Sequence, residues 1–264
     1  MGKSVDKRGD KDVVRTALIT GASSGIGESL ARCFAAGGHA LVLVARSKDK
    51  LDALAAALVA AYGVKVTVLP ADLALPAAAQ GLATALKRKR IAVDVLVNNA
   101  GVLEQGAFAS MRAQRHQQMI DLNVSGLTAM LATFVPAMCE RGFGRVLNVA
   151  SIAAFQPVPT LATYAATKAY VLSLTESLAE ELRPRGVTVT ALCPGITATG
   201  MLADATAHNA RLASLPGFVI GDAAEVAAAG STCSSTTPAS WSRARSRSPP
   251  RRATSSSSTS TSPG

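Results

Sequence analysis

The sequence predicts an α/β protein built on one doubly wound parallel sheet, with helices on both faces of that sheet. Six short apolar or β-branched runs recur along the chain, and longer segments with helical periodicity separate them. Strands that alternate with helices form parallel sheets through right-handed crossovers. The chain has 264 residues, of which 48% are hydrophobic and 17% are charged, so it can bury one large core, and we expect a single domain.

The expected strands cover residues 13–20, 39–45, 64–69, 93–98, 145–150 and 187–193. Segment 47–62 illustrates the helices between them, because Leu51, Leu54, Leu58 and Ala61 form an apolar stripe at helical spacing. Ligands of open parallel sheets bind beyond the carboxyl ends of the strands. Chemically interesting residues should therefore follow each run.

Each of the six runs is followed by such residues. They are, in chain order, Gly21, Arg46, Asp72, the four residues Asn98, Asn99, Ala100 and Gly101, then Ser151, and finally Pro194 with Gly195. Turns use the same residue types, so this pattern supports a site at one edge of the sheet without proving it.

The first run leads into a glycine-rich loop, T-G-A-S-S-G-I-G, at residues 20–27. Gly21, Gly25 and Gly27 permit a tight turn and let backbone N–H groups approach a pyrophosphate at the N-terminus of the next helix. Because the loop follows a strand and precedes a helical run, we expect it to bind a nucleotide rather than to serve only as a turn.

The residue after the second run indicates which nucleotide is bound. An NAD-specific site would carry an acidic residue there, but the sequence reads Ala45-Arg46-Ser47. A cation suits the 2′-phosphate of NADP, so we expect NADP, with NAD as the alternative. The competing interpretation is that Arg46 lies on a solvated turn and binds no cofactor. Asp72 is placed either to accept a hydrogen bond from the adenine edge or to cap a helix that begins near Pro76.

Three further groups suggest acid–base chemistry. Tyr164 and Lys168 lie four residues apart in a helical segment and share one face, and Ser151 ends the fifth run. An ammonium beside a phenol favours the phenolate, so in a dry site we expect the Tyr164 pKa to be lowered by roughly 2 to 4 units. Such a tyrosine can exchange a proton near neutral pH. Taken alone, the same spacing is also found among surface residues and core tyrosines.

Asn123 interrupts an apolar helical segment, D-L-N-V-S-G-L. An Asn in this setting has a buried partner or disturbs the helix, so we expect a local kink or a bound water there. A hydrogen-bonded structural Asn is the simplest interpretation.

The net charge of +10 overstates how basic the folded part is. Arg243, Arg245, Arg247, Arg251 and Arg252 supply five of these charges in a tail without acidic residues. The other dense cluster, residues 87–90, ends an expected helix, where cations complement the helix dipole. We therefore do not expect a nucleic-acid partner.

Cysteine and histidine spacing excludes several classes of site. Cys33, Cys139, Cys193 and Cys233 form no C-x-x-C pair, and His39, His116 and His208 lack ligand spacing. We expect reduced thiols, no metal and a cytoplasmic protein. Segment 1–12 has no apolar signal-peptide region, and no apolar run approaches the roughly 18 residues of a membrane span, so we expect no membrane association.

Taken together, these residues resemble the short-chain dehydrogenase/reductase family. Its motifs occur in order between residues 16 and 201: T-G-A-S-S-G-I-G, A-D-L, N-N-A-G, D-L-N-V, Ser151 thirteen residues before Tyr164, Y-A-A-T-K and P-G-I-T-A-T. The resemblance implies a Rossmann-like fold. It also implies an NAD(P)-dependent oxidoreductase that transfers hydride between NADP(H) and a carbonyl or secondary alcohol.

The resemblance also implies residue roles. Ser151, Tyr164, Lys168 and Asn123 would form a catalytic tetrad in which Tyr164 exchanges the proton and Ser151 holds the substrate oxygen. Lys168 would lower the Tyr164 pKa and bind the nicotinamide ribose, and Asn123 would position a water. The expected cofactor-binding residues are Gly21, Ser23, Gly25, Ile26, Gly27, Arg46, Asp72, Asn99, Ala100, Gly101, Pro194, Gly195 and Thr199, together with Tyr164 and Lys168.

The composition changes sharply after residue 229. We expect a polar extension at 1–12, a Rossmann-fold domain at 13–229 and a disordered Ser/Thr/Arg/Pro-rich tail at 230–264. Family members continue here with a helix, a seventh strand and often a subunit interface, so the tail puts homo-oligomerisation in question and leaves a sheet edge uncovered. A reading-frame change and a genuine basic tail both account for it.

Two functions follow from these observations. The expected substrate loops at 102–108 and 152–160 are largely apolar, which favours a small lipophilic carbonyl or alcohol over a sugar phosphate. The first hypothesis is therefore an NADP-dependent oxidoreductase for such a substrate. The alternative is a protein that binds NADP without turnover, as an interaction or sensor module, because its C-terminal part departs from the family.

Overall fold

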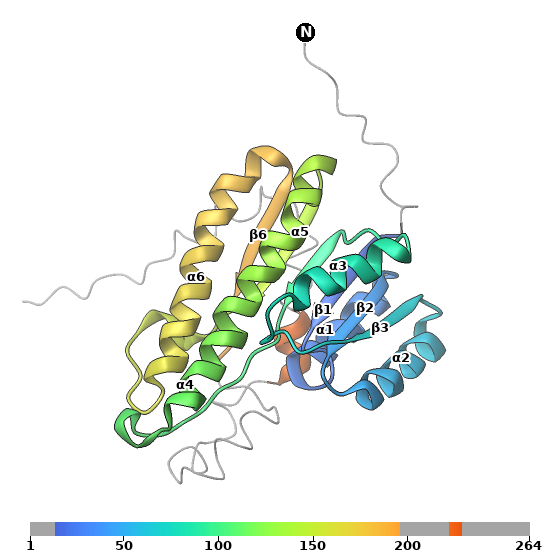
Figure 1. The fold of residues 1–264 in the computed structure, drawn as a ribbon. Coiled ribbons are helices and arrows are strands. Elements are labelled where there is room, and N and C mark those ends of the chain that lie inside the picture. The colour runs from blue at the N-terminus through green and yellow to red at the C-terminus, as the bar shows by residue number, and fades with distance from the viewer. Residues whose placement is uncertain (1–13, 196–221, 229–264) are drawn as a thin grey trace, which may run out of the picture.

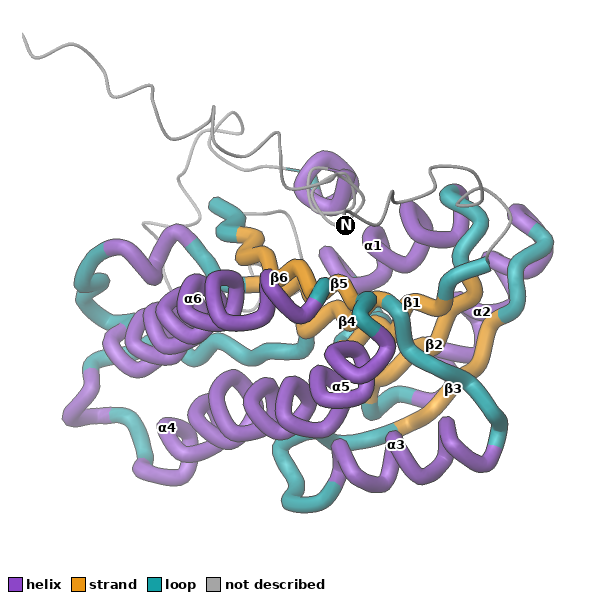
Figure 2. Tube along the Cα trace, turned by 90° about the horizontal axis from the view of Figure 1, so that it is seen from above, coloured by secondary structure: helices purple, strands orange, loops and turns teal. Residues whose placement is uncertain are grey.

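The computed structural model describes residues 14–195 and 222–228, which form a parallel six-stranded sheet between two layers of helices (Figures 1 and 2). The strand order is β3-β2-β1-β4-β5-β6. The strands are β1 (Thr16–Thr20), β2 (Ala40–Ala45), β3 (Val66–Pro70), β4 (Val95–Asn98), β5 (Gly144–Val149) and β6 (Val187–Leu192). The predicted fold class is confirmed, and all six expected strands are present.

Helices connect the strands as the alternation predicts. They are α1 (Gly25–Ala36), α2 (Lys48–Tyr62), α3 (Ala78–Arg88), α4 (Ala113–Ile120), α5 (Leu127–Arg141) and α6 (Ala162–Leu182). A π-helical turn, Asp121–Gly126, joins α4 to α5, and a 3₁₀ turn, Ile152–Phe155, follows β5. A short helix covers residues 223–228, and its Ala227 is fully buried.

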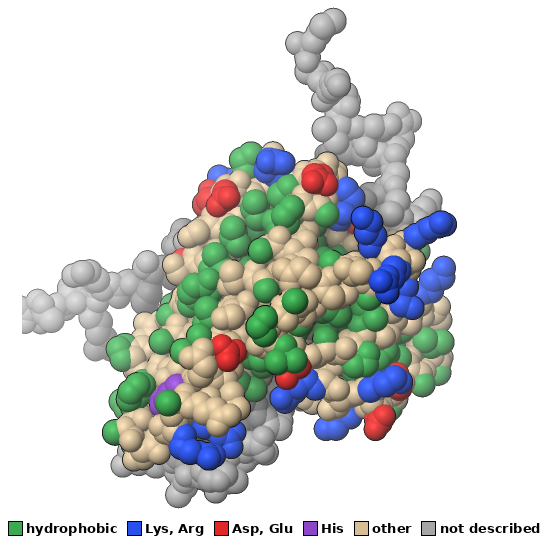
Figure 3. Space-filling model, in the orientation of Figure 1, with side chains coloured by type: hydrophobic (Ala, Val, Ile, Leu, Met, Phe, Trp, Pro, Cys, Tyr) green, Lys and Arg blue, Asp and Glu red, His purple; other side chains and the backbone are tan. Residues whose placement is uncertain are grey.

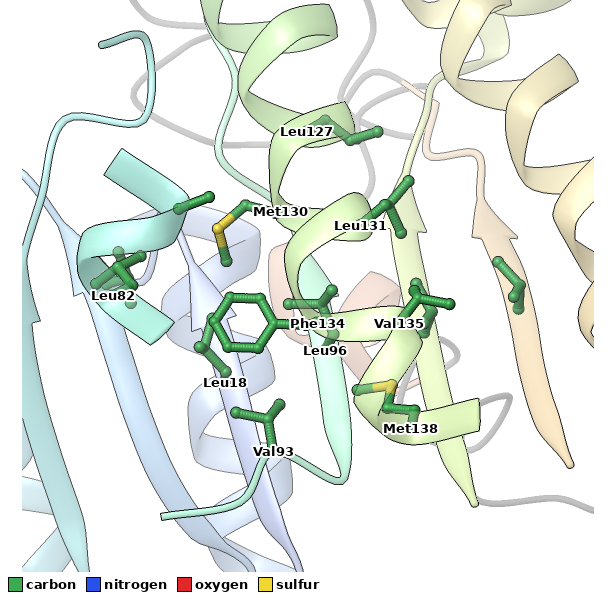
Figure 4. Close-up of a cluster of buried hydrophobic side chains, with 14 of the residues drawn as sticks. Leu18, Leu82, Val93, Leu96, Leu127, Met130, Leu131, Phe134, Val135 and Met138 are labelled. Atoms are coloured by element: carbon green, nitrogen blue, oxygen red, sulfur yellow. The ribbon is translucent and has the colours of Figure 1, made fainter. Parts of the chain in front are cut away.

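Each face of the sheet buries its own apolar cluster. Side chains of α3, α5 and α6 pack on one face, and those of α1 and α2 pack on the other. Figure 4 shows the first cluster, in which Phe134 and Met130 of α5 lie against Leu18 of β1 and Leu96 of β4. Burying one such side chain contributes about 1.5–3 kcal/mol. The tightly packed sheet thus fixes where the strand ends lie.

The helix α2 follows the predicted stripe except at one end. Leu51, Leu54 and Leu58 are buried, as expected. The prediction for Ala61 is wrong, because residues 59–62 form the last turn of α2 and are all exposed.

The cationic cluster at 87–90 does end α3, and Figure 3 shows Lys and Arg side chains gathered there at the surface.

One helical stretch, Ala113–Arg141, is long and apolar enough to cross a membrane by length and composition alone. It comprises α4, the π-helical turn and α5, and the buried side chains of α5 belong to the core cluster of Figure 4. A helix buried against a sheet passes the same test, so this stretch is explained as a core helix. The cellular location stays a prediction.

Candidate functional site

The strand order reverses between β1 and β4, and a pocket of about 260 Å³ lies beyond the carboxyl ends of the strands at that point. The chain runs outward from β1 to β3, then returns to β4 and runs outward on the other side. Connections therefore diverge there, and no crossover covers the crevice. This is the edge at which the sequence places its polar residues.

The glycine-rich loop lines one wall of this pocket. Gly21 and Gly25 have φ angles of 65° and 56°, which favour glycine, and α1 begins at Gly25. The Ser24 side chain makes no cap hydrogen bond to the first turn of α1, so backbone N–H groups there are available to an anion. The loop therefore fits a dinucleotide pyrophosphate.

Gly27 packs closely against the glycine-rich loop. A Cβ atom on Gly27 would lie 2.2 Å from the Gly21 carbonyl oxygen and 2.4 Å from the Asn99 side-chain nitrogen. Gly27 does not line the pocket. Its missing side chain lets α1 pack against the loop that carries Gly21.

A buried threonine, Thr20, links the first and fourth strands beneath the pocket. Its hydroxyl donates to the Val97 carbonyl at 3.1 Å and accepts from the N–H groups of Asn99 and Ala100 at 2.9 and 3.0 Å. The Asn99 amide donates to the carbonyls of Thr20 and Gly21. Thr20 begins the glycine motif, but it was not among the residues expected at the site.

Most of the expected cofactor residues meet in this pocket. Those that line it are Gly21, Ser23, Gly25, Ile26, Arg46, Asp72, Asn99, Ala100 and Gly101. The pocket also has lining residues that sequence reasoning missed: Ser24, Val44, Ala45, Ser47, Ala71, Leu73, Val102 and Leu122. Several are chain neighbours of expected residues and could have been included. Leu122 lies in the π-helical turn and only tertiary packing brings it here.

Arg46 and Asp72, the residues expected to bind the cofactor after the second and third strands, both line the pocket wall. Arg46 is exposed at the end of β2, so its guanidinium can reach a 2′-phosphate. The alternative role for Asp72, capping a helix near Pro76, is wrong. The helix α3 begins at Ala78, and the Asp72 carboxylate accepts from the Ala74 N–H at 3.1 Å.

Tyr164, Lys168 and Ser151 come together at the side of the pocket nearest β5. Tyr164 and Lys168 are buried on α6, with the Lys168 Nζ 5.7 Å from the Tyr164 ring centre. This Nζ donates to the Val149 carbonyl at 2.8 Å. Gly101 of the pocket wall adjoins this group, because a Cβ there would lie 3.5 Å from the Lys168 Nζ. The cofactor pocket and the acid–base groups are thus contiguous.

The expected direction of the Tyr164 pKa shift is wrong for this structure. Burial raises the pKa of the Tyr164 phenol, and a hydrogen bond with Ser151 opposes that rise. Burial also lowers the pKa of Lys168 from 10.5 to about 8. Desolvation by burial is the largest cause of both pKa shifts. Tyr164 is therefore protonated at neutral pH.

Asn123 is buried and fully engaged. Its side-chain oxygen accepts from the Val102 N–H at 2.9 Å, and its amide donates to the Val102 carbonyl and to the Thr167 hydroxyl at 2.9 and 3.1 Å. It lies within the π-helical turn, so both a helix disturbance and a hydrogen-bonded structural Asn are found, as expected. Asn123 thereby fixes the loop after Gly101 against α6.

The remaining expected residues lie beside the pocket or outside the described residues. The Pro194 carbonyl accepts from the Ile152 N–H at 3.0 Å, which ties the end of β6 to the turn after Ser151. Neither Pro194 nor Gly195 lines the pocket. Thr199, Cys233, His208 and the tail at 230–264 lie outside the described residues. Within the described residues, Cys33, Cys139 and Cys193 are free thiols, and no cluster of potential metal ligands is found.

Comparison with known proteins identifies the family. Residues 15–210 match the family model described as short chain dehydrogenase. Oxidoreductase UcpA of Escherichia coli (strain K12) is 38% identical over 188 residues, which cover 71% of each chain.

Two solved structures share the fold. A short-chain dehydrogenase from Sphingobium yanoikuyae in complex with NADPH is 38% identical, with a TM-score of 0.76 over 83% of each chain. The bulky-bulky ketone specific alcohol dehydrogenase from Comamonas testosteroni is 35% identical, with a TM-score of 0.72 over 83% of this chain and 82% of that one. The chain belongs to the short-chain dehydrogenase family, and this membership makes it an NAD(P)-dependent oxidoreductase.

Proposed function

We propose that the chain interconverts a ketone or aldehyde and the corresponding alcohol with NADP(H), and that Tyr164 exchanges the proton. The observation that carries the proposal is the position of Tyr164. It is a buried phenol whose pKa is raised by burial, a rise that Ser151 opposes, beside a pocket that fits a dinucleotide. When a carbonyl is reduced to an alcohol, its oxygen must receive a proton, and a protonated phenol can donate it.

In this proposal each side chain has a distinct task. When bound, the nicotinamide supplies the hydride for reduction or accepts it in oxidation. The Ser151 hydroxyl holds the substrate oxygen, and the Tyr164 phenol gives that oxygen its proton. The Lys168 amine, held by the Val149 carbonyl, faces Gly101 and the cofactor side of the site. Asn123 keeps this arrangement in place by binding both Val102 and Thr167.

The cofactor side of the site favours NADP over NAD. Arg46 at the end of β2 can pair with a 2′-phosphate, and the strand end carries no carboxylate that would repel one. The relative from Sphingobium yanoikuyae was solved with NADPH, which agrees with this preference.

The substrate side favours lipophilic molecules. Val102, Leu103, Val158 and Leu161 pack around Tyr164 with Ala153 and Met119, so the phenol is approached through apolar surface. The relative from Comamonas testosteroni is named for bulky ketones. We infer that a ketone with apolar substituents is a better substrate than a sugar phosphate.

The test is NADPH oxidation by the full chain across aliphatic ketones, aryl ketones and sugar phosphates. Tyr164→Phe should lower kcat by about 10²- to 10⁴-fold, because it removes the proton donor and little volume. Tyr170→Phe is the matched control: Tyr170 lies on the same helix, and its hydroxyl bonds to Thr128 on the surface. If Tyr164→Phe turned over as fast as Tyr170→Phe, the proposed mechanism would fail.

The cofactor preference is tested separately. Arg46→Ala should raise the KM for NADPH by about 10- to 100-fold, since a charge-assisted bond to phosphate is lost, and should leave the KM for NADH nearly unchanged. Tight NADPH binding without turnover on the whole panel would instead select the alternative of a binding module. The oxidoreductase names of the relatives do not favour that alternative.

A further inference from the structure

A line of buried hydrogen bonds runs from β4 through β5 into α6. The Asn98 amide donates to the Asn148 side-chain oxygen at 2.9 Å, and the Asn148 amide donates to the Thr175 hydroxyl at 2.9 Å. The Thr175 hydroxyl in turn donates to the Val171 carbonyl at 2.6 Å within α6. All three polar side chains are at most 2% exposed, and Val171 belongs to the apolar core cluster around them.

Each hydrogen bond in this network fixes the direction of the one before it. Because the Thr175 hydroxyl gives its single hydrogen to Val171, it can only accept from Asn148. Asn148 then presents its amide to Thr175 and its oxygen to Asn98. The Asn148 side chain cannot turn over without losing both partners. Buried polar networks of this kind fix the relative position of the elements that they join.

The network lies directly beside the contact that holds Lys168. Asn148 and Val149 are consecutive residues of β5, and the Val149 carbonyl accepts from the Lys168 Nζ at 2.8 Å. Lys168 and Thr175 are seven residues apart on α6 and share a face, so neighbouring residues of β5 hold two turns of the helix. A slide of α6 by about 1.5 Å, the rise of one helical residue, would stretch the Lys168 bond beyond hydrogen-bonding distance.

We propose that Asn148 and Thr175 are positioning residues, whose hydrogen bond sets the place of α6 along β5 at which the Lys168 amine meets the Val149 carbonyl and faces the cofactor pocket. Neither Asn148 nor Thr175 lines that pocket, so both act through Lys168. The inference rests on the proposed function only for the task of Lys168 on the cofactor side.

The pKa of Lys168 reports where its amine lies. Tyr164 on the same helix and Cys193 after β6 are the titratable groups that face this amine from the described part of the chain. Burial lowers the pKa of Lys168 from 10.5 to about 8. The amine adjoins the open pocket at Gly101, so loosening α6 lets it turn toward water there. Relief of the desolvation then raises the pKa.

The test replaces Thr175 with valine, which keeps the shape of the side chain and removes the hydroxyl. The pKa of Lys168 is measured in the full chain by NMR after labelling lysine Cε with carbon-13, and Lys168→Met identifies the signal. Thr175→Val should raise this pKa by about 1 unit or more and should weaken NADPH binding about 5- to 10-fold. Thr175→Ser, which keeps the hydroxyl, should leave both values near wild type.

A matched control is Thr84→Val on α3, because the Thr84 hydroxyl also donates to the carbonyl four residues earlier, that of Gln80, at 2.9 Å. It should change neither value. Thr175→Ala is measured as well, since it removes the hydroxyl without requiring the second methyl group of valine to fit, and it should act in the same direction.

The outcomes separate positioning from stability and from the proposed function. A purely structural role predicts that Thr175→Val and Thr175→Ala lower the thermal midpoint but leave the Lys168 pKa unchanged, and that result would overturn the proposal. So would an equal pKa shift in Thr175→Ser. Neither measurement needs turnover. If Lys168→Met itself left NADPH binding unchanged, the proposed task of Lys168 would fail; if Lys168→Met weakened binding and Thr175→Val did not, the positioning role would fail.

Discussion

Replacing Thr20 with valine should uncouple the cofactor loop from the sheet. The Thr20 hydroxyl is buried and makes three hydrogen bonds, one to the Val97 carbonyl and two from the N–H groups of Asn99 and Ala100. Valine has nearly the same shape, so the change leaves those three backbone groups without their partner and opens no large cavity. Each unpaired buried group costs about 1–3 kcal/mol.

We expect the free energy of unfolding to fall by about 3 kcal/mol, less than the full sum because the adjoining pocket gives water access to part of the loop. Urea unfolding followed by circular dichroism measures this change. The dissociation constant for NADPH should rise by about tenfold, since Asn99 and Ala100 line the pocket. Thr20→Ser, which keeps the hydroxyl, is the control and should retain most of the stability and affinity. A Thr20→Val chain within about 0.5 kcal/mol of wild type would refute the reasoning.

The other predictions concern Lys168 and two glycines. Burial lowers the folded-state pKa of Lys168 to about 8, so between that pH and 10.5 the unfolded chain binds a proton that the folded chain has lost. The free energy of unfolding should therefore rise with pH across this window by up to about 3 kcal/mol, and Lys168→Met and Lys168→Arg should both lose that rise. An identical pH profile in all three chains would contradict it. Gly27→Ala should fail to bind NADPH and should lower the thermal midpoint, because its Cβ would lie 2.2 Å from the Gly21 carbonyl oxygen. Gly81→Ala, in an open exposed position of α3, should instead stabilise the chain by about 0.5–1 kcal/mol.

The sequence predicted the fold well because its signals are local and repeated. Six apolar runs, each followed by turn or polar residues, need only short-range pattern to be recognised, and the structure contains all six strands. The glycine loop could be assigned to nucleotide binding for the same reason. Its neighbours, a strand before and a helix after, are visible in the chain.

Predictions failed where the answer depended on the balance of forces around a group. The spacing of Tyr164 and Lys168 showed that they share a helix face, but it could not show that the Lys168 amine binds the Val149 carbonyl. It could not show how deeply both groups are buried either, and burial decides the direction of both pKa shifts. The prediction that Asp72 caps a helix near Pro76 failed for a similar reason. A carboxylate near a helix start can equally accept a hydrogen bond within its own turn, as Asp72 does from the Ala74 N–H.

The sequence by itself determined the order of strands and helices, the glycine-rich loop between the first strand and helix, and the candidate acid–base groups. These depend on residue type and spacing along the chain. Tertiary structure alone decided how Thr20 and Asn123 tie separate segments to the site and how deeply Tyr164 and Lys168 are buried. Those features join residues far apart in the chain, so their hydrogen bonds and charges exist only once the sheet has brought the strand ends together.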